Sequence, residues 1–122
     1  MTLQELYQNM GEDYEQAIRV LRMDKLVDKH IRKLTKNGVV DQLLTAGETM
    51  DPTRMFECAH AMKGVCANLG LTELSRAASD IAEEYRPGKA RQHTDEEVKA
   101  MLSQIAAMYQ KTADAIRKYE EV

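Results

Sequence analysis

Hydrophobic residues recur at intervals of three and four positions along most of the chain, which is the period of one face of an α-helix. The clearest run is an apolar stripe within residues 51–70, formed by Met55, Ala59, Met62, Cys66 and Leu69. A longer stripe of the same kind runs from Val98 to Ile116. No stretch shows the alternation of a β-strand, and there is no internal repeat or low-complexity tract. The pattern predicts an all-α protein.

Three strong signals mark where helices begin. Thr2 with Glu5, and Thr94 with Glu97, have the spacing of a capping box, in which two side chains satisfy free backbone N–H groups. Asp51-Pro52 places an N-cap acid before a proline at the first helical position. Helices are therefore expected to start near residues 3, 52 and 95.

Glycine and proline mark where the helices end. They predict short helices up to about residue 11 and over about 13–22, followed by a longer helix from 24. Asn37-Gly38 breaks or kinks that helix, and Gly47 is expected to end the segment that resumes at 39. Gly70 is a suitable residue to follow the 52–69 helix, and the next helix finishes before Pro87-Gly88.

These elements fit an antiparallel up-down four-helix bundle with one or two short additional N-terminal helices packed across or beside it. A chain of 122 residues is long enough to bury a core. We expect residues 1–122 to form a single domain, with the hairpin of about 51–87 at its centre.

Composition excludes several classes of function. The formal net charge of −3 and the lack of a basic stretch with aromatic residues argue against nucleic-acid binding. No apolar run approaches the roughly 18 residues that cross a membrane, and the start does not resemble a secretion signal. Cys58 and Cys66 lie too far apart to pair and lack metal-site spacing, so both are expected as reduced thiols with Cys66 buried. We expect a cytoplasmic protein.

Candidate chemistry lies on the side of the 52–69 helix that faces away from the stripe. At about 100° per residue, His60 points about 140° from the centre of the stripe and Gly64 about 180° from it. Lys63 lies at the flank. The imidazole of histidine is a nucleophile near neutral pH, because its unperturbed pKa is about 6.5. Glycine inside a helix costs about 1 kcal/mol relative to alanine, which indicates that close approach is needed there.

Each of these residues also has an ordinary interpretation. His60 alone reads as an incidental exposed histidine, Lys63 as a solvated flank residue and Gly64 as a tolerated glycine. His30 falls among core positions and is expected to be partly buried at the core edge, whereas His93 is expected to be merely solvated in a polar loop. A metal site between His60 and another histidine of the bundle is disfavoured.

Taken together, the spacing of His60, Lys63 and Gly64 favours a functional site over these ordinary interpretations. It resembles the histidine-containing phosphotransfer (HPt) family in the segments Ala59-His60-Ala61-Met62-Lys63-Gly64, Asn68-Leu69-Gly70 and Leu74-Ser75-Arg76-Ala77-Ala78. The chain departs from the family pattern at Val65 and Cys66, where serine, alanine or glycine is common. The resemblance covers the central hairpin closely, and the rest through helix lengths and order.

The resemblance implies that His60 accepts a phosphoryl group from the aspartate of a receiver domain and passes it to another receiver. It implies that Lys63 offsets the added charge and that the small residues Gly64 and Ala67 let the partner approach closely. Met55, Phe56 and Glu57 are weaker candidates for docking.

The implied partners are response-regulator receiver domains and a hybrid sensor histidine kinase. No cofactor of the chain's own is expected, since Mg²⁺ would belong to the receiver. The chain lacks kinase motifs, so we expect a phosphocarrier and not an enzyme. We also expect a monomer, because the bundle can close within a single chain. Two alternatives remain: a non-signalling helical adaptor that keeps the fold without phosphotransfer, and the phosphoacceptor domain of a chemotaxis-type kinase. The absence of kinase domains from these residues argues against the second, unless the chain is an excised fragment.

Overall fold

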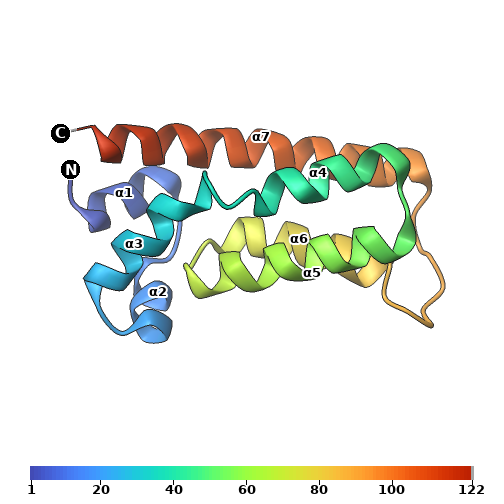
Figure 1. Cartoon of the computed structure of the whole chain (residues 1–122), viewed down its shortest axis with the longest axis horizontal. Helices are drawn as coiled ribbons and strands as arrows, with labels where there is room; N and C mark the ends of the chain where they lie inside the picture. Colours follow the sequence, from blue (N-terminus) through green and yellow to red (C-terminus); the bar gives the residue numbers. More distant parts are fainter. Residues whose placement is uncertain (122) are drawn as a thin grey trace.

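The computed structural model describes residues 1–121, which form seven helices and no strands (Figure 1). In chain order these are α1 (Leu3–Met10), α2 (Tyr14–Leu21), α3 (Asp24–Leu34), α4 (Val39–Thr49), α5 (Pro52–Asn68), α6 (Thr72–Glu84) and α7 (Asp95–Glu120).

The helices α4, α5, α6 and α7 form a closed bundle, in which each packs against the next and α7 returns to α4. The α5–α6 hairpin has the most extensive contact. The shorter helices gather at one end, where α1 packs on α7 and α2 packs on α3 and α5 (Figure 1). The all-α bundle predicted from the hydrophobic pattern is confirmed, and α3 leads into α4 through the predicted break at Gly38.

The predicted start signals work as the sequence indicates. Both capping boxes form, at Thr2 with Glu5 and at Thr94 with Glu97. The Asp51 side chain accepts a hydrogen bond from the backbone N–H of Arg54 at the start of α5. The positions of these helices are therefore fixed by local side-chain chemistry as well as by packing.

The apolar stripe of α5 lies wholly in the core. All five of its residues are buried, and Cys66 is a free thiol, as predicted. Burial raises the pKa of the Cys66 thiol to about 12, and the nearby charge of Glu12 adds to the effect. Because this side of α5 faces inward, the opposite side must face solvent.

The prediction that Gly47 ends a helix is wrong. The helix α4 continues through Thr49 and ends at Met50, whose φ of 57° is in the left-handed region. Gly47 serves a different purpose: a Cβ atom there would lie 2.5 Å from Cδ1 of Leu102. The missing side chain lets α4 approach α7 closely.

The connection between α1 and α2 is fastened to the C-terminal end of α5. The Tyr7 hydroxyl donates a buried hydrogen bond of 2.6 Å to the carbonyl of Leu69. The backbone N–H of Asp13 donates to the carbonyl of Gly70 at 2.9 Å. Gly70 has a φ of +68°, and a Cβ atom there would lie 2.0 Å from the Asp13 carbonyl oxygen. Only glycine fits this position.

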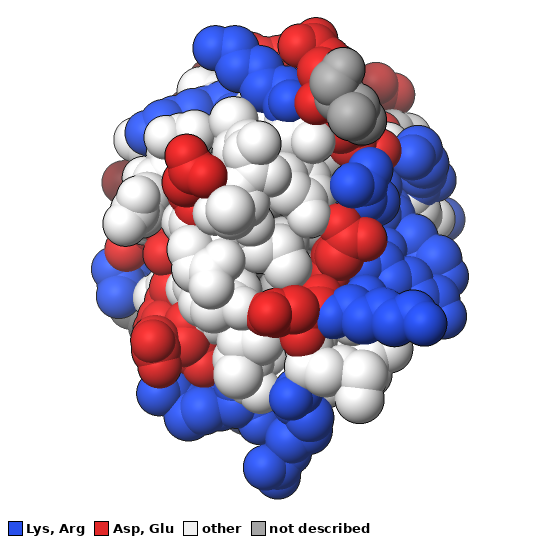
Figure 2. All heavy atoms as spheres, turned by 90° about the vertical axis from the view of Figure 1, so that its left-hand side faces the viewer, with Lys and Arg blue, Asp and Glu red and all other residues white. Residues whose placement is uncertain are grey.

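The end of the molecule formed by α1, α2 and α3 shows a largely uncharged area with charged side chains around it (Figure 2). Among residues 1–121, the most exposed large hydrophobic residues are Met1, Val20 and Met23, which all belong to this part of the chain. None of the helices in this same range is long and apolar enough to cross a membrane.

Candidate functional site

His60 lies near the middle of α5 and is exposed to solvent. The buried stripe is on the other side of the helix, so the outward direction predicted from helical periodicity is confirmed. Among residues 1–121, no polar group forms a hydrogen bond with the imidazole. The ring nitrogens are therefore free to react with an incoming group.

One face of the His60 ring is covered by an aromatic neighbour. The rings of Phe56 and His60 are stacked, with centroids 5.6 Å apart and an angle of 18° between their planes. Phe56 is half-buried and packs against the hydrophobic core. A residue predicted as a weak docking candidate thus contacts the candidate nucleophile itself.

Gly64 leaves open space one turn further along the helix. It is exposed, and a Cβ atom at this position would meet no atom within 4 Å. The fold of the chain therefore does not require glycine at position 64, in contrast to positions 47 and 70. The geometry is what close approach by another surface would need, although the approach itself stays a prediction.

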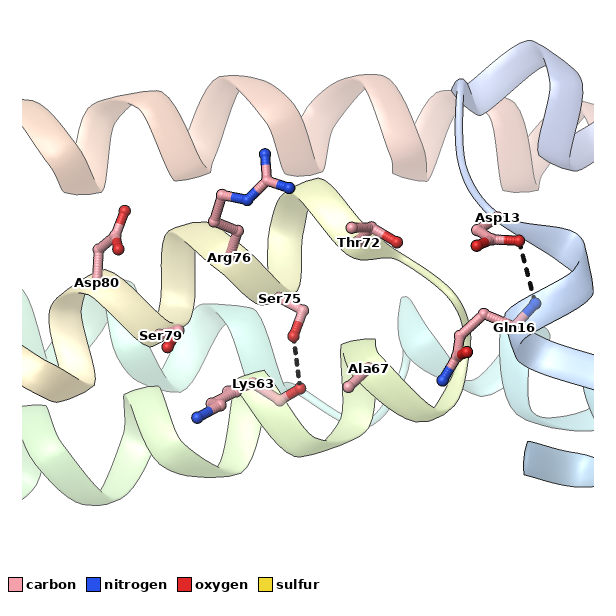
Figure 3. Close-up of a pocket in the computed structure, with 9 residues that line it drawn as sticks. All are labelled: Asp13, Gln16, Lys63, Ala67, Thr72, Ser75, Arg76, Ser79 and Asp80. Carbon is pink, nitrogen blue, oxygen red and sulfur yellow. Dashed lines mark hydrogen bonds between the residues drawn. The ribbon is translucent and has the colours of Figure 1, made fainter. Parts of the chain in front are cut away.

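Lys63 and Ala67 line a groove of about 470 Å³ between α5, α6 and the start of α2 (Figure 3). Ser75 on α6 donates a hydrogen bond of 3.1 Å to the backbone carbonyl of Lys63 and so ties the two helices together beside the site. The Lys63 side chain extends back along α5 toward its N-terminal end, the direction in which His60 lies (Figure 3). Within residues 1–121 its ammonium forms no ion pair.

The other flank of the α5 face has a smaller hollow of about 290 Å³. Val65 and Asn68 of α5 line it together with Leu21, His30 and Lys33 from the short N-terminal helices. The expectation that His30 is partly buried at the core edge is wrong. It is exposed, because it lies beside the buried stripe of α3 and not within it.

The structure gives different outcomes for the two remaining docking candidates, Met55 and Glu57. Met55 is 0% exposed, so in this structure it cannot contact a partner; it opens the buried stripe and belongs to the core. Glu57 is exposed and lines a shallow hollow with Arg54, Cys58 and Ala61. Glu57 is therefore accessible, and its part in docking stays a prediction.

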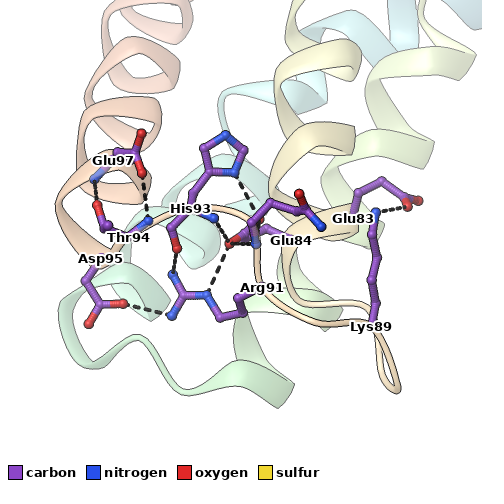
Figure 4. A network of polar contacts seen from close by, with 9 residues as sticks. Glu83, Glu84, Lys89, Arg91, His93, Thr94, Asp95 and Glu97 are labelled. Carbon is purple, nitrogen blue, oxygen red and sulfur yellow. Dashed lines mark hydrogen bonds and ion pairs between the residues drawn. The ribbon is translucent and has the colours of Figure 1, made fainter.

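His93 is not merely solvated, as the sequence had indicated. Its Nδ1 atom lies 3.0 Å from Oε1 of Glu84, and its backbone N–H donates to Oε2 at 2.8 Å (Figure 4). Glu84 also accepts hydrogen bonds from Arg91 and from the backbone N–H of Gln92. This cluster fastens the loop between α6 and α7.

Glu84 is a buried carboxylate that the sequence reasoning missed, at 3% exposure. Burial alone would raise the pKa of Glu84, but the hydrogen bonds from His93, Gln92 and Arg91 outweigh it and hold the pKa at about 2. The same contact raises the pKa of His93. The sequence signal that could have revealed this cluster is a glutamate on the apolar side of a helical pattern, nine residues before a loop histidine. The cluster is structural and lies apart from the face of His60.

A family model for the Hpt domain matches residues 2–114 of the 122-residue chain. The chain belongs to the Hpt domain family. The predicted resemblance is thereby confirmed, and membership implies phosphotransfer in two-component signalling. Hpt domains carry phosphoryl groups and are not kinases, and they interact with receiver domains and histidine kinases. The search of curated proteins and the search of solved structures found no match.

Proposed function

We propose that His60 is the phosphoacceptor of this Hpt domain, taking a phosphoryl group from a receiver aspartate and giving it to the aspartate of a second receiver. The observation that carries the proposal is the position of His60. It is an exposed histidine on the outward side of a core helix, and the matched family region includes it. Of the three histidines, His93 is engaged with Glu84, and His30 belongs to α3 and lies at the flank of the α5 face.

For phosphoryl transfer, the chain mainly has to present the His60 ring to the receiver. The lone pair of an unprotonated imidazole nitrogen forms the N–P bond while the P–O bond to the aspartate breaks, and the electron pair of that bond stays on the carboxylate. Such transfers need the attacking atom, phosphorus and leaving oxygen roughly in line. A ring that stands on an exposed helix face permits this approach. Mg²⁺ and the acidic residues that hold it would belong to the receiver.

Lys63 supports the phosphorylated state in this proposal. A phosphoryl group brings a charge of about −1.5 to −2 at neutral pH. The half-buried Lys63 carries an ammonium without a partner among the described residues and extends toward the turn of His60. Because the ammonium is also close to solvent, we expect its effect to be modest and to weaken as salt is added.

The partner surface would rest mainly on small residues near the ring and on the side chains that border them. Gly64 and Ala67 leave room for close approach, and Phe56 and Glu57 border the same face. We further propose that the donor is a receiver domain of a hybrid sensor kinase, that the acceptor is a response regulator, and that the chain works in the cytoplasm as a monomer.

The test is transfer of a labelled phosphoryl group from purified, phosphorylated receiver domains of the same genome. We expect acid-labile label on the wild-type chain and none on His60→Gln, while His30→Gln and His93→Gln accept label as the wild type does. Label that persists in His60→Gln would contradict the assignment. If the wild-type chain accepts no label from any receiver, the non-signalling adaptor is the better description.

A further inference from the structure

Among the described residues, the His60 ring lacks the hydrogen bond that usually orients a reactive histidine. A reactive histidine is commonly held by a hydrogen bond from one ring nitrogen to a carboxylate or carbonyl group. Within residues 1–121 no such bond to His60 exists. The ring is also exposed, so close packing does not fix it. The specific contact that remains is the stack on Phe56.

The stack follows from the geometry of the helix. Side chains four residues apart lie on the same side of a helix, and each leans toward the N-terminus. The His60 ring therefore leans over the preceding turn, where Phe56 lies. The rings meet nearly in parallel, with 18° between their planes.

Phe56 is well placed to act as an anchor. It is half-buried and packs against the hydrophobic core, so its own ring is held from below. The next turn in the other direction carries Gly64, which has no side chain and no neighbouring atom within 4 Å of a Cβ position. One side of the imidazole is therefore covered and the other is open.

We propose that Phe56 is a positioning residue for phosphotransfer, which holds the His60 ring in one orientation and leaves its edge free on the Gly64 side. This inference rests on the proposed function of His60. Without the stack the ring would spread over the staggered side-chain conformations that the helix allows. Fewer encounters with the receiver would then find the nitrogen in line with phosphorus.

The matched variants are Phe56→Leu, which keeps an apolar side chain but removes the aromatic ring, and Phe56→Tyr, which keeps the ring. The first measurement is the ¹H shift of the imidazole C–H protons of unphosphorylated protein. In the wild type and in Phe56→Tyr we expect the His60 signals upfield of those of His30, which is exposed and has no aromatic partner among the described residues. In Phe56→Leu this difference should be lost.

The second measurement is single-turnover transfer from a phosphorylated receiver over a range of receiver concentrations. We expect Phe56→Leu to lower the maximal rate about three- to tenfold, the factor that one aromatic pair contributes, at an unchanged half-saturating concentration. Phe56→Tyr should restore the rate.

Two results would overturn the inference while leaving the proposed function intact. One is a wild-type His60 signal that is not shifted relative to His30 and does not respond to Phe56→Leu. The other is a raised half-saturating concentration at an unchanged maximal rate, which would make Phe56 a docking residue. Failure of every receiver to phosphorylate the wild-type chain would instead refute the proposed function, and the positioning role with it.

Discussion

Substitution of Gly64 separates the demands of folding from those of partner binding. Gly64 lies in the interior of α5, is exposed, and has no atom within 4 Å of the place where a Cβ would be. Alanine is favoured over glycine in a helix by about 1 kcal/mol, and no clash opposes that gain here. Gly64→Ala should therefore stabilise the isolated chain, with a rise in melting temperature of roughly 3–5 °C for a domain of this size.

The same position should tolerate a large side chain in the fold but not in the complex. Gly64→Gln places a long side chain on the open side of the His60 ring, where the receiver is proposed to approach. Overfilling a close contact costs about 1–3 kcal/mol, which corresponds to a loss of about 5- to 150-fold in transfer efficiency. The isolated Gly64→Gln protein should be no less stable than the wild type, because glutamine is also a better helix former than glycine.

The assay pairs thermal unfolding followed by circular dichroism with single-turnover transfer from a receiver. Ala107→Gln, at an exposed position of α7, serves as the matched control and should transfer at the wild-type rate. If Gly64→Ala melts below the wild type, the space described around Gly64 is wrong. If Gly64→Gln transfers as fast as the wild type, the receiver does not use that space.

Three further predictions concern stability. Gly70→Ala should cost about 2–5 kcal/mol of folding stability, because alanine is strained at a φ of +68° and its Cβ would meet the backbone of α2. The control variant Gly88→Ala has a φ of +83° but lies in open space, so it should cost only about 1–2 kcal/mol. Tyr7→Phe should cost about 1–3 kcal/mol, since it removes the buried hydrogen bond to Leu69. Glu84→Gln should also cost about 1–3 kcal/mol at neutral pH and should weaken the acid sensitivity of the chain.

The sign of the acid effect follows from the depressed pKa of Glu84. The unfolded carboxyl takes up its proton near pH 4.5 and the folded one near pH 2, so acidification through this window favours the unfolded state. Melting temperatures measured from pH 6 to pH 2 should fall more steeply in the wild type than in Glu84→Gln. Parallel profiles of melting temperature against pH in the two proteins would contradict the role given to Glu84. Equal losses of stability in Gly70→Ala and Gly88→Ala would contradict the clash between residue 70 and α2. Unchanged melting of Tyr7→Phe would show that the Leu69 carbonyl finds another donor.

Much of the fold could be predicted because the positions of the helices depend on local sequence patterns. The helix period, the capping boxes at Thr2 and Thr94 and the Asp51-Pro52 start each act within a few residues, and all are found in the structure. The direction of His60 followed from the same arithmetic, since burial of one stripe fixes the opposite side. Gly47 was misread because its purpose, a close approach of Leu102 on α7, lies 55 positions away in the sequence and has no local signature.

The parts of the site that were missed depend on contacts between elements or on side-chain conformation. His93 looked like a solvated loop residue because its partner, Glu84, belongs to the preceding helix. The stack of Phe56 on His60 is compatible with the i, i+4 spacing but is decided by how the two rings turn. Met55 was placed both in the core and among the docking candidates, and only its complete burial decides between them.

The central claim is that the phosphoryl group resides on His60, and the most direct measurement is NMR of the ¹⁵N-labelled chain after phosphorylation by a receiver. Correlations from the ring protons to the ring nitrogens report each of the three imidazoles separately. The account predicts that one nitrogen of His60 changes its shift to that of a phosphorylated nitrogen, while His30 and His93 keep theirs. A phosphorylated nitrogen in His30 or His93, with His60 unchanged, would contradict it.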